Sequence, residues 1–362
     1  MKAAVCRTFG APLVIEDLQL AAPGPGEVQV RLKACAICHS DVTYMDGGWG
    51  GETPVVFGHE AAGIVERTGP GVGHLAIGES VIVTLLRTCG QCYYCAQGHG
   101  SLCETSFHLD QQTPLTDAAG QAVGQGLRTG AFAEQVVVEA SQVVAIPASL
   151  PMASASLLSC GVITGFGAVT NVARIQPGMT TVTIGTGGVG LNCIQGAAIC
   201  RAACNIAVDL SDDKIEAARR FGASHGLNAR EPNLVDEVRR LSDGRGADCV
   251  FVAAGSAAAL EQALQLVRRG GMVVLVGMTA EGVTAQVDTL SLAGDAVQVV
   301  GSKMGRVDLA TDIPQLVAHY QAGRLKLDEL VSGRFVLEEI NDAVDGVRRG
   351  EALRNVIVFP DR

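Results

Sequence analysis

A glycine-rich stretch in the middle of the chain most constrains its fold. The sequence Gly-Thr-Gly-Gly-Val-Gly occupies positions 185–190, after an apolar segment at 181–184 that predicts a strand and before a helix expected to end near Cys200. Glycines at these spacings permit a tight turn and let the backbone approach a pyrophosphate, while N–H groups at the helix start attract its negative charge. The stretch therefore predicts a βαβ unit that binds a dinucleotide through Gly185, Gly187, Gly188 and Gly190.

An acidic residue after the next strand supports this interpretation. Asp209 follows a predicted strand at 205–208 and lies 19 residues beyond the last glycine. A carboxylate at this place accepts hydrogen bonds from the adenosine ribose hydroxyls and repels a 2′-phosphate, so it favours NAD over NADP. The alternative is a glycine-rich turn with only a structural role, and the surrounding strand, helix and acid argue against it.

Short apolar strands and helices alternate through the second part of the chain. From about residue 157 this alternation predicts an α/β fold with a doubly wound parallel sheet. Further strands are expected at 249–253, 272–276 and 297–301, and further helices at 213–221, 235–241 and 257–267.

The rest of the chain has a different pattern of predicted secondary structure. The first 150 residues predict a compact β domain with long loops, whose strands are expected at 2–6, 13–17, 27–36, 61–67 and 80–84. After residue 302 the pattern predicts helices at 313–322 and 340–349 and a terminal strand at 355–359 that returns to the first domain. The chain would cross between the domains twice, and we expect cofactor and substrate to bind in a cleft between them.

A thiol, an imidazole and a carboxylate occur close together in the first domain. Cys38, His59 and Glu60 fall within 23 residues, beside glycines that let the backbone fold back. A catalytic zinc keeps three protein ligands and leaves a fourth position open. Cys160, just before the dinucleotide motif, is the best distant candidate for the third ligand, and Glu60 is either an alternative ligand or a neighbouring carboxylate. The alternative is a buried cysteine and an ordinary histidine that are neighbours by chance.

Four further cysteines have the spacing of a closed metal site. Two-residue gaps let successive thiolates converge on one ion, and a fourth thiolate closes a tetrahedron with no open position. This pattern predicts a structural zinc that fixes a long loop, with an iron–sulfur cluster or a nucleic-acid-binding zinc ribbon as alternatives. The four residues are Cys89, Cys92, Cys95 and Cys103.

Composition narrows the class of protein. A formal net charge of −10 without a basic cluster argues against nucleic acid and anionic lipid as partners. No apolar run is long enough to span a bilayer, and the first residues are interrupted too early for a signal-peptide core, so we expect a cytoplasmic protein without a membrane partner. Six of the 12 cysteines are then metal ligands, and the others are expected in the core.

Together these motifs resemble the zinc-containing, medium-chain alcohol dehydrogenases over the whole chain. The resemblance implies a GroES-like β-rich catalytic domain at 1–161 and 303–362 and a Rossmann NAD-binding domain at 162–302. It also implies one structural zinc and one catalytic zinc, the latter on Cys38, His59 and Cys160 with Glu60 as an occasional ligand. The implied reaction is reversible hydride transfer between an alcohol and NAD, in a homo-oligomer for which a dimer is favoured over a tetramer.

The resemblance also assigns roles to single residues. Ser40 resembles the hydroxyl that takes the substrate proton, but Thr43 stands where the family usually has the histidine that ends the proton path. The implied nicotinamide contacts are Thr164, Val189 and Val276, the pyrophosphate partners His39 and Arg354, the ribose pair Asp209 and Lys214, and the apolar pocket residues Trp49, Leu85 and Phe132.

Several alternatives remain at this point. The apolar pocket favours medium-chain or aromatic primary alcohols. A polyol, or a thiol adduct of formaldehyde whose carboxylate meets Arg128 in the long loop at 103–132, would be an alternative substrate. A non-zinc enoyl or quinone reductase would share the fold but lack Cys38 and Cys160 as paired ligands. A zinc-stabilised dinucleotide-binding protein without catalysis would keep the four-cysteine site and could lose Ser40.

Overall fold

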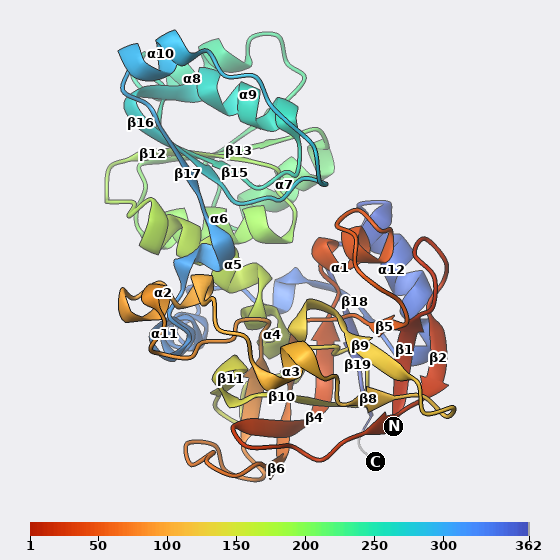
Figure 1. Cartoon of the computed structure of the whole chain (residues 1–362). Helices are drawn as coiled ribbons and strands as arrows, with labels where there is room; N and C mark the ends of the chain where they lie inside the picture. The colour runs from red at the N-terminus through yellow and green to blue at the C-terminus, as the bar shows by residue number, and fades with distance from the viewer. Residues whose placement is uncertain (361–362) are drawn as a thin grey trace. The chain divides into compact units, whose positions relative to one another are not determined.

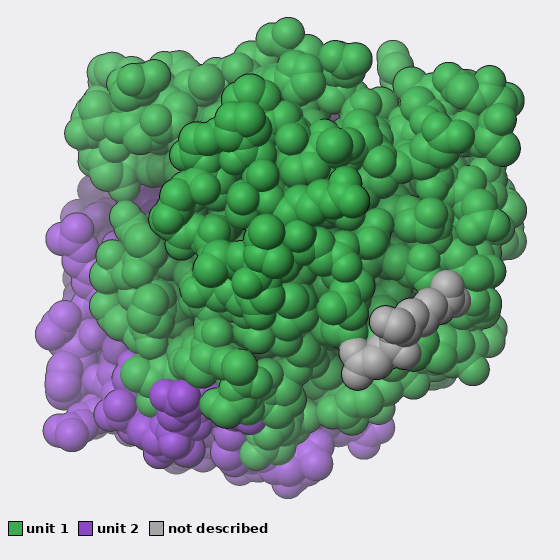
Figure 2. Space-filling view, turned by 90° about the horizontal axis from the view of Figure 1, so that it is seen from below, with its two compact units in different colours: residues 1–160, 308–318, 327–362 green, residues 161–307, 319–326 purple. Residues whose placement is uncertain are grey.

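The chain forms two compact units. The structure is a computed structural model that describes residues 1–360. Unit 1 comprises Met1–Cys160, Asp308–Ala318 and Leu327–Arg362, and unit 2 comprises Gly161–Val307 and His319–Lys326 (Figure 1, Figure 2). Residues 303–307 and 319–326 therefore cluster with unit 2, whereas the sequence analysis placed them in the first domain.

Packing explains this difference in the boundaries. A Cβ on Gly167 would lie 2.6 Å from the Gly305 carbonyl oxygen, so the two backbones are in close contact within unit 2. The Lys326 N–H donates to Gln195 Oε1 at 2.7 Å, and Gln195 Nε2 donates back to the Lys326 carbonyl at 3.1 Å. These contacts depend on the fold and leave no local pattern in the sequence.

Unit 1 is built on two β-sheets. One has the strand order β2-β1-β5-β9-β8-β3, and the other has the order β11-β7-β6-β4-β19-β18 with β10 also paired to β4. The strands are β1 (Lys2–Cys6), β2 (Val14–Asp17), β3 (Gln19–Leu20), β4 (Glu27–Ala36), β5 (Val55–Val56), β6 (Glu60–Thr68), β7 (Ser80–Val83), β8 (Leu115–Thr116), β9 (Ala122–Gln125), β10 (Gln135–Glu139), β11 (Val143–Ala145), β18 (Val331–Phe335) and β19 (Arg354–Val358).

Strand β4 is central to the second sheet of unit 1. Its alternate residues Val28, Val30 and Leu32 are buried in the core of the unit, as the period of two in a strand requires. It pairs with β6 on one side and with β19 on the other, where Cys35 lies opposite Ile357. The expected return of the terminal strand to the first domain is thus confirmed.

The helices of unit 1 are mostly short. They are α1 (His39–Met45), α2 (Tyr93–Ala96), α3 (His108–Gln111), α4 (Met152–Ser156) and α12 (Ile340–Arg348), together with α11 (Leu309–Gln321), whose last residues cluster with unit 2. Within residues 1–360 no single helix is long and apolar enough to cross a membrane. The bent pair Met152–Ser159 and Gly161–Val172 reaches that length and apolar composition only when its two helices are counted together.

Unit 2 contains one parallel sheet of six strands in the order β14-β13-β12-β15-β16-β17, which is the doubly wound arrangement expected from the sequence. Its strands are β12 (Thr180–Ile184), β13 (Cys204–Asp209), β14 (His225–Asn228), β15 (Ala247–Val252), β16 (Val267–Leu275) and β17 (Gln298–Gly301). Its helices are α5 (Gly161–Gly167), α6 (Gly188–Ile199), α7 (Asp212–Arg220), α8 (Leu234–Leu241), α9 (Ala257–Leu266) and α10 (Thr289–Gly294).

Both faces of this sheet are buried. Val250 and Val252 of β15 pack into the cluster that also contains buried residues of α8 and α9, and Phe251 packs into the cluster with Cys193 of α6. Helices α8 and α9 lie on one side of the sheet and α6 lies on the other (Figure 1). Strands covered by helices on both faces are typical of parallel sheets. Strand β14 was missed from the sequence because its residues, His-Gly-Leu-Asn, are only half-buried and carry little apolar signal.

An ion pair ties the long loop of unit 1 to β4. His108 in α3 lies with Nδ1 3.0 Å from Oε1 of the buried Glu27, and this hydrogen bond raises the pKa of His108 above its usual 6.5. The stabilisation from this pair is therefore fully present below the unfolded pKa and is lost as the pH rises through the raised folded value.

We expect His108→Gln to lower the free energy of unfolding more at about pH 5.5 than at about pH 9. The difference is small because the imidazole is exposed, so urea unfolding of both proteins at each pH is the suitable measurement. An equal loss at the two pH values would contradict a protonated His108 paired with Glu27.

Candidate active site and metal centres

Four potential metal ligands converge inside unit 1. The ligand atoms of Cys38, His59, Glu60 and Cys160 all lie within 4.8 Å of one another, and all four residues are buried. Cys38 precedes α1, His59 precedes β6, Glu60 begins β6 and Cys160 follows α4, so the folding of unit 1 brings distant segments together. The structure thus brings together the ligands proposed from the sequence.

The polar atoms of this cluster fit a divalent cation. His59 Nε2 and both carboxylate oxygens of Glu60 are buried without a hydrogen-bond partner among residues 1–360. Buried polar groups left in this way are costly unless something satisfies them. Two sulfurs and one imidazole nitrogen form a donor set that suits zinc and leaves a coordination position open for another ligand. We therefore define Cys38, His59, Glu60 and Cys160 as the catalytic metal cluster.

Protonation within the cluster also favours cation binding. A hydrogen bond from Cys160 lowers the pKa of Cys38 well below its usual value. The same hydrogen bond raises the pKa of Cys160 well above its usual value. Burial raises the pKa of Glu60 to about 8, although Arg354 opposes this shift. Two buried thiols and a carboxyl group cannot all carry negative charge without a compensating cation, and a bound metal provides one.

Asp41 holds the cluster in place, a role that was not predicted from the sequence. Its Oδ1 accepts from the Gly58 N–H and lies 3.0 Å from His59 Nδ1, while its Oδ2 accepts from the Cys38 N–H at 3.0 Å. Because Nδ1 is engaged, Nε2 of His59 is the ring nitrogen that faces the cluster. A partial signal was present, since an acid three residues after a helix-starting residue is typical of a capping pair.

Arg354 lies beside Glu60. The Arg354 Nη1 atom is 3.5 Å from Glu60 Oε1, and the guanidinium is buried at the start of β19. Its Nη2 has no hydrogen-bond partner within the described chain. An anion such as a pyrophosphate would satisfy this donor, so the position is compatible with the expected role of Arg354.

The first turn of α1 carries the other polar candidates of unit 1. His39 is exposed and Ser40 is half-buried. The Thr43 hydroxyl donates to the His39 carbonyl at 3.0 Å, so it is used within the helix.

The apolar candidates differ in their surroundings. Trp49 is half-buried and meets Tyr44 edge to face at a centroid distance of 4.9 Å, and Leu85 is also half-buried. Phe132 is fully buried, and a Cβ on Gly58 would lie 2.6 Å from its ring, so Phe132 braces the turn before His59.

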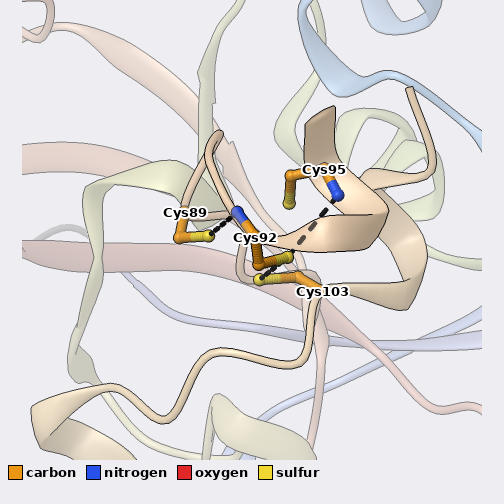
Figure 3. Close-up of side chains that lie close together, drawn as sticks. All are labelled: Cys89, Cys92, Cys95 and Cys103. Carbon is orange, nitrogen blue, oxygen red and sulfur yellow. Dashed lines mark hydrogen bonds between the residues drawn. The ribbon is translucent and has the colours of Figure 1, made fainter. Parts of the chain in front are cut away.

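The second cysteine group forms a compact metal site in the loop at 89–103. The four sulfur atoms lie within 4.8 Å of one another, and the side chains turn toward a common centre (Figure 3). The Cys92 N–H donates to Cys89 Sγ at 3.2 Å, and the Cys95 N–H donates to Cys92 Sγ at 3.5 Å. A hydrogen bond from Thr105, with two backbone N–H groups, lowers the pKa of Cys89 to about 6. This arrangement suits a zinc ion closed by four thiolates.

The glycine-rich turn of unit 2 has the geometry of a dinucleotide site. Gly185 follows β12 with φ of +88°, and a Cβ on Gly190 would lie 1.8 Å from the Gly185 carbonyl oxygen, so only glycine fits there. Nothing lies within 4 Å of a Cβ built on Gly187, which leaves its backbone open to a ligand. Gly188 begins α6, and the N–H groups at a helix start favour negative charge such as that of a pyrophosphate.

The remaining cofactor candidates also lie in unit 2. Asp209 ends β13 and is half-buried, as is Lys214 in α7. Thr164 is buried in α5, with its hydroxyl 3.5 Å from Met304 Sδ, and Val276 is buried just after β16. Val189 is half-buried in the first turn of α6.

Comparisons with known proteins agree with this geometry. Residues 24–148 match the family described as "Alcohol dehydrogenase GroES-like domain", and residues 188–322 match "Zinc-binding dehydrogenase". The chain is 35% identical to an NDMA-dependent alcohol dehydrogenase of Amycolatopsis methanolica, over 99% of this chain and 98% of that protein.

Two solved structures are similar over nearly the whole length. An alcohol dehydrogenase zinc-binding domain protein from Burkholderia ambifaria is 34% identical with a TM-score of 0.95, and each chain is covered to 99%. The benzyl alcohol dehydrogenase of Acinetobacter calcoaceticus is 30% identical with a TM-score of 0.92, again with 99% of each chain covered. With its two cysteine-containing metal clusters and its dinucleotide turn, the chain belongs to the zinc-containing, medium-chain alcohol dehydrogenases.

Proposed function

We propose that the protein catalyses reversible oxidation of primary alcohols to aldehydes with NAD, with aromatic and medium-chain alcohols as preferred substrates. The observation that carries this proposal is the catalytic metal cluster, in which buried His59 and Glu60 atoms without a hydrogen-bond partner in the described chain lie beside two thiols. A zinc ion bound there supplies the positive charge that acidifies a hydroxyl group and polarises a carbonyl. The paired Cys38 and Cys160 also argue against the non-zinc reductase alternative.

The surrounding residues have separate roles in this proposal. Ser40 would take the proton of the alcohol, while the Thr43 hydroxyl donates to the His39 carbonyl. A bound cofactor would supply a ribose hydroxyl as the next group on the path to water. Asp41 orients His59 through Nδ1. The buried position of the cluster keeps bulk water away from the reacting groups.

The proposed cofactor contacts follow the family resemblance and the observed surroundings. The glycine turn with Val189 holds NAD, whose nicotinamide is contacted by Thr164 and Val276. His39 and Arg354 balance the charge of the pyrophosphate, which is supported by the free Nη2 of Arg354. Asp209 and Lys214 bind the adenosine ribose.

The proposed substrate preference depends on the apolar side chains near α1. Trp49 and Leu85 are half-buried and offer apolar surface, while Phe132 is fully buried. The similarity to a benzyl alcohol dehydrogenase supports an aromatic substrate. Arg128 is less suited to receive the carboxylate of a thiol adduct, because its Nε already lies 3.2 Å from Asp110 Oδ1.

A substrate panel tests this proposal. The purified protein is assayed with benzyl alcohol, hexanol, sorbitol and S-hydroxymethylglutathione, each with NAD and NADP, by the absorbance of the reduced cofactor. The proposal expects the highest kcat/KM for benzyl alcohol or hexanol with NAD. Turnover of sorbitol or the thiol adduct alone would refute the substrate class, and no turnover of any alcohol or aldehyde would refute the activity.

A homodimer formed through unit 2 is also part of the proposal. Strand β17 is the last in its sheet, and its residues Gln298, Val299 and Gly301 are exposed, so its outer N–H and C=O groups are available to a second copy. Leu290 in α10 is 81% exposed and adds apolar surface. Sedimentation equilibrium is expected to give about twice the chain mass of 37.3 kDa. A mass of one chain would contradict the dimer.

A further inference from the structure

The carboxylate of Asp209 is fixed by three hydrogen bonds. Its Oδ2 accepts from both the N–H of Thr186 at 2.7 Å and the Thr186 hydroxyl at 3.1 Å. Its Oδ1 accepts from the Ser211 N–H at 3.1 Å. Both oxygens are therefore restrained, so the carboxylate cannot rotate without losing charge-assisted hydrogen bonds.

Both restraints on Oδ2 come from one buried residue, Thr186, through its backbone N–H and its hydroxyl. Thr186 is fully buried and lies two residues after the end of β12, while Asp209 is the last residue of β13. These strands are parallel neighbours, with Ile184 opposite Val208, so the turn after β12 reaches the end of β13. A hydroxyl at position 186 is therefore well placed to hold this acid.

Beside Lys214, the start of α7 carries further negative charge that opposes a 2′-phosphate. Asp212 and Asp213 occupy the first turn of α7 and oppose the attraction of the helix start for anions. Asn228 donates from Nδ2 to Asp212 Oδ1 at 2.8 Å and so holds that carboxylate in place. A phosphate brought to this end of the sheet would face several acids.

We propose that Thr186 is a positioning residue that sets coenzyme choice by fixing the Asp209 carboxylate where a 2′-phosphate would have to lie. A freely rotating carboxylate can turn away from a phosphate and reduce the repulsion, but a fixed one cannot. The same carboxylate is already fixed in place to accept from the two ribose hydroxyls of NAD, so little conformational entropy is lost when NAD binds. This inference rests on the proposed use of NAD and adds the residue that enforces it.

Binding measurements on matched threonine variants test the proposal. Dissociation constants for NADH and NADPH are measured by the fluorescence of the reduced nicotinamide, for wild type, Thr186→Val, Thr186→Ser and Thr183→Val. Thr183 is the matched control, because it is equally buried in β12 and its hydroxyl has no hydrogen-bond partner in the part of the chain that the structure describes. Thermal unfolding of each variant checks that the fold is retained.

The expected result is a change in selectivity. Thr186→Val weakens NADH binding by about tenfold and leaves NADPH binding unchanged or tighter, since a hydrogen bond to a charged group has been removed. Thr186→Ser keeps the wild-type ratio of the two dissociation constants within about twofold, because it retains the hydroxyl. Thr183→Val leaves both constants unchanged. In an Asp209→Asn background, Thr186→Val produces no further change in the ratio.

Three results would overturn the inference. An equal loss of NADH and NADPH affinity in Thr186→Val would indicate a purely structural role, and no change in either dissociation constant would show that Thr186 has no role in coenzyme binding. A ratio that still changes in the Asp209→Asn background would mean that Thr186 does not act through Asp209. Each of these leaves wild-type NADH binding and alcohol turnover intact, whereas a wild-type protein that binds neither dinucleotide would refute the use of NAD itself.

Discussion

Cys160→Ala is expected to reduce alcohol oxidation by on the order of 10³-fold or more and to lower the zinc content from two ions to one per chain. The thiol of Cys160 lies in the catalytic metal cluster with Cys38 and His59, and its removal leaves two strong ligands, which hold a divalent ion poorly. Binding of NADH should persist, because the glycine turn and Asp209 belong to unit 2. Activity assays, metal analysis and NADH fluorescence titration on the same sample provide the measurements.

A matched variant separates loss of metal from loss of fold. Cys193 is also a fully buried free cysteine, but it packs in the core of unit 2 and burial raises the pKa of its thiol to about 12. Cys193→Ala should therefore retain both zinc ions and near wild-type turnover. If Cys160→Ala kept two zinc ions and full activity, the assignment of the catalytic metal cluster would be wrong.

Cys92→Ser is expected to remove the other zinc ion and to destabilise the loop at 89–103. The described residues of this loop contain only the short helix α2 and a single 3-10 turn, so the metal is its main source of order. We expect the melting temperature to fall by on the order of 5 °C and limited proteolysis to cut within the loop. Turnover per catalytic zinc should change much less than in Cys160→Ala.

Cys200→Ser is the control for this second experiment. Cys200 is also only partly buried, but it lies at the end of α6 and outside either metal cluster. It should retain two zinc ions and resist proteolysis at 89–103. Unchanged metal content in Cys92→Ser would contradict a structural zinc at the four cysteines.

Some of this structure could be predicted from the sequence because the signal is local. The four cysteines from Cys89 to Cys103 are close in the chain, and their spacing alone indicates that their sulfurs can meet. The turn from Gly185 to Gly190 combines steric demands with a preceding strand and a following helix, and the structure confirms each of these elements. Patterns of this kind constrain the backbone within a few residues.

Other features depend on contacts between distant segments. The role of Asp41 became visible only when the fold brought the Gly58 N–H and the His59 ring to its carboxylate. The hydrogen bonds between Thr186 and Asp209 likewise require the register of β12 against β13. No local spacing links Cys160 to Cys38, so the sequence offered Cys160 only as the best distant candidate for the third ligand, and the family resemblance completed that assignment.

Anomalous diffraction at the zinc absorption edge tests the central claim most directly. A crystal of the purified protein is expected to give two anomalous peaks per chain, one among Cys38, His59 and Cys160 and one among the four cysteines between 89 and 103. A crystal of fully active protein with no peak among Cys38, His59 and Cys160 would contradict the account.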